Sequence, residues 1–145
     1  MIIGSFPGTL SEARRIAVPK KFLNELGDRP IIAKWYESCL ILVNNGFWEE
    51  LSLRLTGGNQ KFNLLVRDIE RFILGSAYEV EPDEQGRIVI PEELAKYAGI
   101  SKEIIFLGLL DRVEIWPKEN WEEKNKSLPR LTRDYIENLA KNEKR

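Results

Sequence analysis

The sequence predicts a mixed α+β fold built from two copies of one unit. First, Arg15-Ile16-Ala17-Val18-Pro19 returns as Arg87-Ile88-Val89-Ile90-Pro91 at an offset of 72 residues, and Trp48-Glu49-Glu50 returns as Trp121-Glu122-Glu123 at an offset of 73. Second, strand-like and helix-like patterns alternate within each copy. Third, 145 residues is a single-domain length, whereas one copy of about 45 residues would be marginal alone. Because a repeat unit cannot bury its apolar face by itself, we expect the copies to share one core.

Composition narrows the classes of function. The net charge is −1 and the pI about 5.7, so any nucleic-acid surface must be local. Histidine, the commonest general base and transition-metal ligand, is absent, which weighs against ordinary enzymes. The single cysteine, Cys39, excludes an internal disulfide and is expected to be a small buried apolar residue. With no signal peptide and no apolar run near the roughly 18 residues that span a bilayer, we expect a soluble cytoplasmic protein.

The first copy is predicted to contain three strands and two helices. Ile16 and Val18 alternate with their neighbours at the period of a half-buried strand, and Pro19 has a fixed φ that suits the first turn of a helix. Gly27 can take the left-handed conformation that ends a helix. The predicted elements are a strand at 15–18, a helix at 20–26, strands at 31–34 and 40–43 around a turn at 37–38, and a helix opening at 47–48.

The second copy is predicted to repeat this order. Its elements are a helix carrying Leu94, Tyr97 and Ala98 that ends at Gly99, strands at 104–107 and 113–116 around a turn at 111–112, and a helix opening at Trp121. Between the copies we expect a break at 56–59 and a connecting helix at 61–74. After Pro129, residues 131–145 are expected to form a helix that frays into solvent or packs on a neighbour. The expected division of the chain is a first repeat at 1–51, a connecting helical segment at 52–75, a second repeat at 76–124 and a helical tail at 125–145.

The turn before each repeated arginine differs between the copies. In the second copy, Gly86 can adopt a positive φ at little steric cost, and the Asp83 carboxylate is spaced to accept the Arg87 guanidinium and pin the turn. In the first copy, Ser11 stands in the place of that aspartate and Arg14 in the place of the glycine. Arg14 therefore either takes a left-handed backbone, at about 1 kcal/mol or more, or forces another loop conformation.

These substitutions, together with Lys20 and Lys21 in place of Glu92 and Glu93, reverse the local charge. Residues 10–23 carry four cations against one carboxylate, a net +3, whereas residues 82–95 carry one cation against four carboxylates, a net −3. A basic loop on a nearly neutral protein is usually only solvated surface. However, an arginine on a turn between strands can donate two hydrogen bonds to guanine in the major groove of DNA. We therefore predict DNA contacts to bases or phosphates by Arg14 and Arg15, and to phosphates by Lys20 and Lys21.

The repeated segment also resembles a known family. Residues 83–91, DEQGRIVIP, resemble the DxxGRxxIP core of the swapped-hairpin family that includes the transition-state regulator AbrB and the antitoxin MazE. Two such units in one chain of this length, each ending in a Trp-Glu-Glu helix start, resemble the MraZ family. The resemblance covers nearly everything except the tail.

The resemblance implies a specific fold and role. Proteins of this family have a double-split β-barrel with flanking helices, and several chains close into a ring whose N-terminal loops face repeated promoter boxes. They regulate the bacterial division and cell-wall gene cluster, their own gene included. In this chain Arg15 and Arg87 match the repeated arginine of the family. Ser11, Arg14, Ile3 and Leu23 depart from its pattern, and Ile3 and Leu23 stand where relatives often carry arginine.

Three functional hypotheses follow. The leading one is a repressor that binds specific sequences of double-stranded DNA, forms a ring of subunits and is associated with the nucleoid. It catalyses no reaction, and no cofactor, metal, membrane or small-molecule ligand is expected. The competitor is an antitoxin-like or scaffold protein of the same fold that grips another protein through its charged C-terminal segment, with Trp121, Tyr135 and Ile136. An enzyme has no positive support, because the chain lacks histidine and a phosphate-cradling glycine motif.

Overall fold

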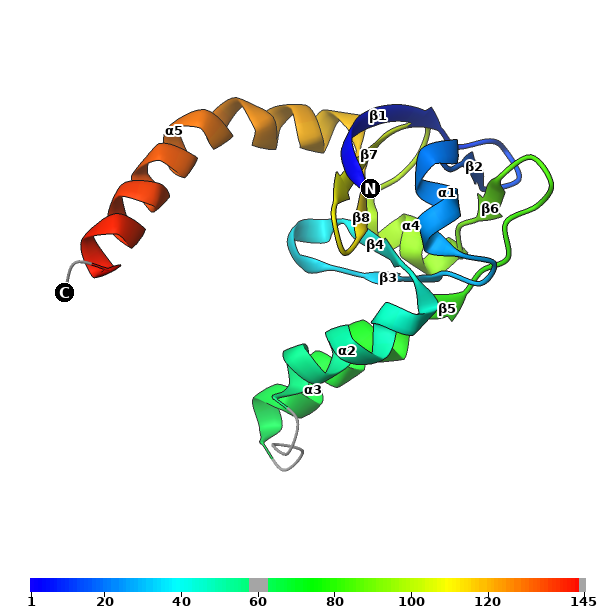
Figure 1. Cartoon of the computed structure of the whole chain (residues 1–145). Coiled ribbons are helices and arrows are strands. Elements are labelled where there is room, and N and C mark those ends of the chain that lie inside the picture. Colours follow the sequence, from blue (N-terminus) through cyan, green and yellow to red (C-terminus); the bar gives the residue numbers. More distant parts are fainter. Residues whose placement is uncertain (58–62, 144–145) are drawn as a thin grey trace.

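The computed structural model describes residues 1–57 and 63–143 and contains a large sheet, a short ribbon and five α-helices in that part of the chain (Figure 1). The strands are β1 (Ile3–Thr9), β2 (Arg15–Ala17), β3 (Ile31–Lys34), β4 (Leu40–Val43), β5 (Tyr78–Glu79), β6 (Arg87–Val89), β7 (Glu103–Leu109) and β8 (Val113–Pro117). The helices are α1 (Lys20–Leu26), α2 (Asn45–Thr56), α3 (Leu64–Ile73), α4 (Glu92–Ala98) and α5 (Lys118–Glu143), with short 3-10 helices η1 (Tyr36–Ser38) and η2 (Leu74–Ser76). Six strands form an antiparallel sheet in the order β1-β7-β8-β4-β3-β5, and β2 pairs with β6 in a separate two-stranded ribbon.

The ribbon joins the two copies about an approximate two-fold axis. Ile16 of β2 lies opposite its own counterpart, Ile88 of β6, and the antiparallel register continues on both sides of this pair. Two further hydrogen bonds obey the same symmetry: Val18 N donates to Gly86 O at 3.1 Å, and Ile90 N donates to Arg14 O at 2.8 Å. The turn of each repeat therefore accepts a backbone hydrogen bond from the residue that follows the ribbon strand of the other repeat.

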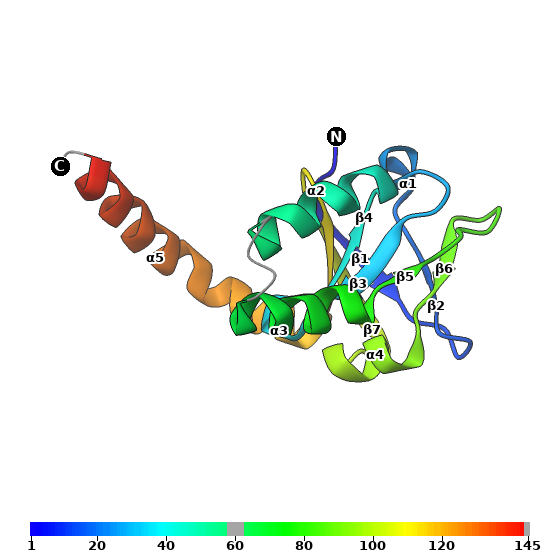
Figure 2. The same cartoon turned by 90° about the horizontal axis from the view of Figure 1, so that it is seen from below.

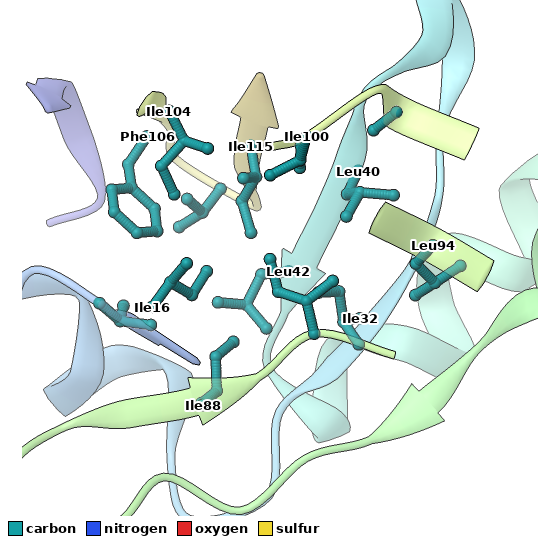
Figure 3. Close-up of a cluster of buried hydrophobic side chains, with 14 of the residues drawn as sticks. Ile16, Ile32, Leu40, Leu42, Ile88, Leu94, Ile100, Ile104, Phe106 and Ile115 are labelled. Carbon is teal, nitrogen blue, oxygen red and sulfur yellow. The ribbon is translucent and has the colours of Figure 1, made fainter. Parts of the chain in front are cut away.

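One face of the sheet packs against this ribbon and the two short helices. Ile16 and Ile88 point from the ribbon toward Ile32 and Leu42 of the sheet, and both ribbon side chains are at most 1% exposed (Figure 3). Helix α1 adds Phe22 and Leu26 to this core, and α4 adds Leu94, Ala95 and Ala98. The shared core expected from the repeat is therefore present.

The other face of the sheet is covered by the longer helices. Successive residues of the central strands alternate between the two faces, so that Ile41 and Val43 point away from the ribbon and pack with Leu51 of α2 and Ile73 of α3. The first turn of α5 is held to the same face by Trp121, whose ring contacts that of Trp116 with centroids 5.7 Å apart. Beyond this turn, α5 leaves the body of the protein (Figures 1 and 2).

The predicted mixed α+β class is confirmed, and strands and helices lie where both repeats predict them. Within the described residues the strand pairing records no closed barrel, so the double-split β-barrel stays a prediction. The edge strand β1 was not predicted. Gly27 ends α1 with φ 80° and ψ −171°, which is not the predicted left-handed helical conformation, whereas Gly99 adopts it with φ 68° and ψ 28°.

Two helical predictions need correction. The segment between the repeats contains two helices: α2 runs to Thr56, and α3 begins at Leu64. The predicted break at 56–59 and the predicted helix start at 61 lie partly outside the described residues. At the other end, Pro129 does not interrupt the chain, since α5 continues through it to Glu143. A proline inside a helix removes one backbone hydrogen bond and bends the axis, and Figure 1 shows α5 as a curved rod.

Candidate nucleic-acid interface

Two turns with the same backbone hydrogen bonds precede the ribbon strands. In the first, Ser11 N donates to Arg15 O and Arg14 N donates to Ser11 O, both at 2.9 Å. In the second, Asp83 N donates to Arg87 O and Gly86 N donates to Asp83 O, again at 2.9 Å. The substitutions at Ser11 and Arg14 therefore preserve the backbone of the turn and change only what it displays.

Arg14 has the left-handed backbone that the glycine pattern requires. Its φ is 57°, against 77° for Gly86. Of the two alternatives left open by the sequence, the strained backbone is the one observed. The cost for a non-glycine residue is about 1–2 kcal/mol.

The Asp83 carboxylate pins the second turn. It accepts hydrogen bonds from Arg87 N, Arg87 Nε and Gln85 N, all at 2.9 Å. The hydrogen bond from the Arg87 backbone is the main cause that holds the pKa of Asp83 below its ordinary value of 3.8. Arg87 is thereby neutralised by a carboxylate on its own turn.

The first turn offers no such carboxylate to Arg15. Ser11 Oγ accepts a hydrogen bond from Arg15 N at 3.1 Å, which replaces one of the backbone contacts of Asp83 but leaves the guanidinium unneutralised. Because Ile16 points into the core, Arg15 lies on the opposite, solvent face of the ribbon and is exposed. Arg15 therefore displays a free positive charge where its counterpart Arg87 does not.

The other three predicted cations differ in how tightly they are held. Arg14 Nε donates to Ile90 O at 3.2 Å, a contact across the ribbon that the sequence pattern did not reveal. Lys21 Nζ lies 5.2 Å from the centroid of the Phe6 ring, close enough for a cation–π contact. Lys20 is exposed at the start of α1. Within residues 1–57 and 63–143, no ion pair involves any of the four predicted DNA-binding side chains, Arg14, Arg15, Lys20 and Lys21.

The two turns lie at opposite ends of the ribbon, because their strands are antiparallel (Figure 2). Charge is reversed between equivalent helix starts: Lys20 and Lys21 of α1 correspond to Glu92 and Glu93 of α4. Each end of the ribbon joins the turn of one repeat to the helix start of the other, because Val18 N donates to Gly86 O and Ile90 N donates to Arg14 O. The cationic first turn therefore lies beside the acidic start of α4, and the acidic second turn lies beside the cationic start of α1.

The described residues show few signs of other chemistry. No group of three or more histidine, cysteine, aspartate or glutamate side chains in this part of the chain could hold a metal ion. Burial raises the pKa of the Cys39 thiol, which makes it a poor nucleophile. None of the described helices is long and apolar enough to cross a bilayer.

Fold and site together define a tandem-hairpin protein whose two halves are joined through a shared ribbon and carry opposite charges. Comparison with known proteins identifies the family. Residues 73–140 match the family model described as "MraZ protein, putative antitoxin-like".

Relatives match over most of the chain. A protein of Clostridium acetobutylicum is 41% identical over 132 residues, which are 88% of this chain and 89% of the relative. A protein of Caldanaerobacter subterraneus subsp. tengcongensis is 36% identical over 142 residues, 96% of each chain. A protein of Leuconostoc mesenteroides subsp. mesenteroides is 36% identical over 143 residues, 97% of this chain and 94% of the relative. All three are named transcriptional regulator MraZ. The chain therefore belongs to the MraZ family.

Proposed function

We propose that the protein is a transcriptional repressor that binds specific DNA boxes through its first turn. The observation that carries the proposal is the contrast between two equivalent arginines: Arg87 is neutralised by Asp83, whereas Arg15 is exposed and has no carboxylate partner among the described residues. The names of the relatives, which are transcriptional regulators, support the same role.

Each predicted cation has its own part in recognition. Arg15 enters the major groove and donates to N7 and O6 of guanine, a contact worth about 1–3 kcal/mol of base discrimination. Arg14, whose guanidinium is partly held by Ile90 O, contacts a base or a phosphate beside it. Lys20 and Lys21 neutralise phosphates and supply affinity that does not depend on sequence.

One turn with so few phosphate contacts would bind DNA weakly, so several copies of the chain must act together. Several chains form a ring, each with repeats at 1–51 and 76–124, a connection at 52–75 and a tail at 125–145. The ring offers its cationic turns to repeated promoter boxes, and tethering multiplies their affinity. A double-split barrel, in which the ribbon closes one side of the sheet, would hold each turn rigidly. The promoters are those of the division and cell-wall cluster, including the protein's own, which places the protein in the cytoplasm at the nucleoid.

The test uses the two equivalent arginines as a matched pair. Wild type, Arg15→Ala and Arg87→Ala are compared in gel shifts and footprints on the DNA upstream of the protein's own reading frame and on a scrambled duplex. Arg15→Ala should lose about 5- to 150-fold in affinity for the promoter, as expected for one lost bidentate contact, while Arg87→Ala keeps most of it. If Arg15→Ala binds the promoter as wild type does, the assignment is wrong.

The exposed arm formed by α5 favours a second candidate function. Tyr135, Ile136 and Leu139 are about 60% exposed on a helix that has no buried residue, a surface suited to gripping another protein, as in an antitoxin or scaffold. Such a protein would co-purify with a partner from its host and would not shift its own promoter.

A further inference from the structure

The first turn is enclosed by residues of the second repeat. On one side, Ile90 N donates to Arg14 O at 2.8 Å, and Arg14 Nε donates to Ile90 O at 3.2 Å. On the other side, Leu10 N, directly before the turn, donates to Lys102 O at 2.7 Å. A duplex that contacts Arg15 would therefore also meet side chains of the second repeat.

The two lysines at the start of α1 lie at the other end of the ribbon. A β-carbon on Gly86 would lie 2.6 Å from Leu23 Cδ1, so α1 packs against the second turn, and Lys20 and Lys21 lie beside that turn. Each ribbon strand has three residues, a length of roughly 10 Å. This length separates the two lysines from Arg15. A cation that holds the phosphates closest to Arg15 must therefore come from the first end of the ribbon.

Lys102 lies at this first end, on the face of the sheet that carries the ribbon. It directly precedes β7, in which Ile104 and Phe106 point into the core beneath the ribbon (Figure 3). Because side chains of a strand alternate between the two faces, residue 102 shares the face of these two residues. Leu10, to which Lys102 is hydrogen-bonded, packs against the same core. The exposed side chain of Lys102 is therefore placed next to the first turn.

The charge of Lys102 is not neutralised by the protein. Within residues 1–57 and 63–143, no ion pair involves its side chain. The repeat offset of 72 makes Pro30 its counterpart, since 102 − 72 = 30, and Pro30 O accepts a backbone hydrogen bond from Val80 N at 2.9 Å. The equivalent place beside the second turn is therefore occupied by a proline. An added cation accompanies only the turn whose arginine is free.

Carboxylates near the first turn oppose its contact with DNA. Glu12 lies on the turn itself, and Glu92 and Glu93 lie at the start of α4. Lys96 Nζ is 3.4 Å from Glu92 Oε1 and offsets that charge, whereas Glu93 has no ion-pair partner in the part of the chain that the structure describes. Phosphates are repelled by these carboxylates. A free lysine at position 102 would offset the repulsion.

We propose that Lys102 binds a backbone phosphate of the duplex whose base Arg15 contacts. The recognition surface is then composite: the first repeat supplies the arginine that reads a base, and the second repeat supplies a cation that fixes the register of the strand. Both residues lie on backbone that is hydrogen-bonded between the repeats, so their spacing is set before DNA arrives, which reduces the entropy lost on binding. This inference deepens the proposed function and rests on it.

Salt titration tests the phosphate contact. Lys102→Ala should weaken binding to the promoter and to a scrambled duplex by the same factor, and it should reduce the slope of log affinity against log salt by about 1. Lys102→Arg, which keeps the charge, should have the wild-type slope. Lys126→Ala is the matched control, because it removes one exposed lysine from α5, and it should also keep that slope. All three side chains are exposed or on the surface helix, so circular dichroism should show folded variants. A wild-type slope in Lys102→Ala would overturn the proposal.

Affinity cleavage locates residue 102 on the duplex. Lys102→Cys and Lys126→Cys are each labelled with iron–EDTA and bound to the promoter at saturating protein concentration; Cys39 is buried and should not be labelled. The label at 102 should cut the DNA backbone beside the base pairs whose protection is lost in Arg15→Ala, and the label at 126 should not. Cutting at other places only, or equal cutting by both labels, would contradict the proposed contact.

The outcomes separate this inference from the proposed function. If Arg15→Ala loses the promoter while Lys102→Ala keeps the full salt slope, the proposed function stands and the phosphate contact is refuted. If wild type binds the promoter and the scrambled duplex equally while Lys102→Ala lowers the slope, sequence-specific repression is refuted and the phosphate contact stands. A wild type that binds neither duplex would refute both.

Discussion

A β-carbon added to Gly86 would lie 2.6 Å from Leu23 Cδ1, closer than real contacts allow. Gly86 also has φ 77°, so a side chain is disfavoured there by space and by backbone. In the other repeat Arg14 corresponds to Gly86, and Ala95 corresponds to Leu23. The smaller residue at 95 leaves room at the first turn, so Arg14 bears only the backbone cost.

We predict that Gly86→Ala is more destabilising than Gly99→Ala. Both residues have a positive φ, so both variants should lose about 1 kcal/mol for the backbone. A β-carbon on Gly99 would meet nothing within 4 Å, whereas one on Gly86 must also displace Leu23. Urea unfolding of the two variants measures the difference. Combining Gly86→Ala with Leu23→Ala should cost less than the two single changes together, and strict additivity would contradict the steric account.

The Asp83 carboxylate makes stability depend on pH. Its pKa is lower in the folded chain than the ordinary 3.8, so its ionised form stabilises the fold above that value, and the contribution is lost as the pH falls through the lowered pKa. Asp83→Asn should therefore be less stable than wild type near neutral pH, and the gap should close in acid. Thermal unfolding across this range tests the prediction, and a gap that does not change with pH would count against it.

Lys20 and Glu92 form a matched pair for the salt dependence of DNA binding. Lys20→Ala should weaken binding to all duplexes alike and reduce the slope of log affinity against log salt by about 1, because one phosphate contact is lost. Glu92→Ala, at the equivalent position of the second repeat, should leave the slope unchanged, because it removes no phosphate contact. Titration of a labelled duplex at several salt concentrations measures both, and equal slopes for wild type and Lys20→Ala would remove Lys20 from the interface.

The turn between β3 and β4 is strained at two non-glycine residues, Glu37 with φ 62° and Ser38 with φ 58°. Ser38→Gly should raise the free energy of unfolding by about 0.5–1 kcal/mol, since relief of the left-handed backbone outweighs the added freedom of the unfolded chain. Ser5→Gly, in the exposed strand β1, is the control and should lower it by a similar amount. Chemical denaturation at fixed pH compares them.

Internal repetition made most of the fold predictable. The match of Arg15 with Arg87 fixed the phase of both copies, and the segments on either side of the predicted turns then located β3, β4, β7 and β8. That these strands form one sheet covered on both faces is a finding of the structure. The predicted contact between Asp83 and Arg87 is present because it needs only the local geometry of one turn.

Elements that depend on distant partners were not predictable in this way. Strand β1 contains Gly4, Pro7 and Gly8, which are unfavourable in strands, and it forms because it pairs with β7 along its full length. A β-carbon on Gly108 would lie 2.7 Å from Ile3 N, so this pairing requires a glycine on the opposite strand. Likewise, the contact from Arg14 to Ile90 O joins residues 76 positions apart.

The reversal of charge between the repeats brings unlike groups together at each end of the ribbon. The cationic first turn lies beside the acidic start of α4, and the acidic second turn lies beside the cationic start of α1. A duplex would therefore meet attraction from the arginines and repulsion from the neighbouring carboxylates at the same contact. Selection could adjust this balance through a handful of solvent-facing side chains without disturbing a single buried residue.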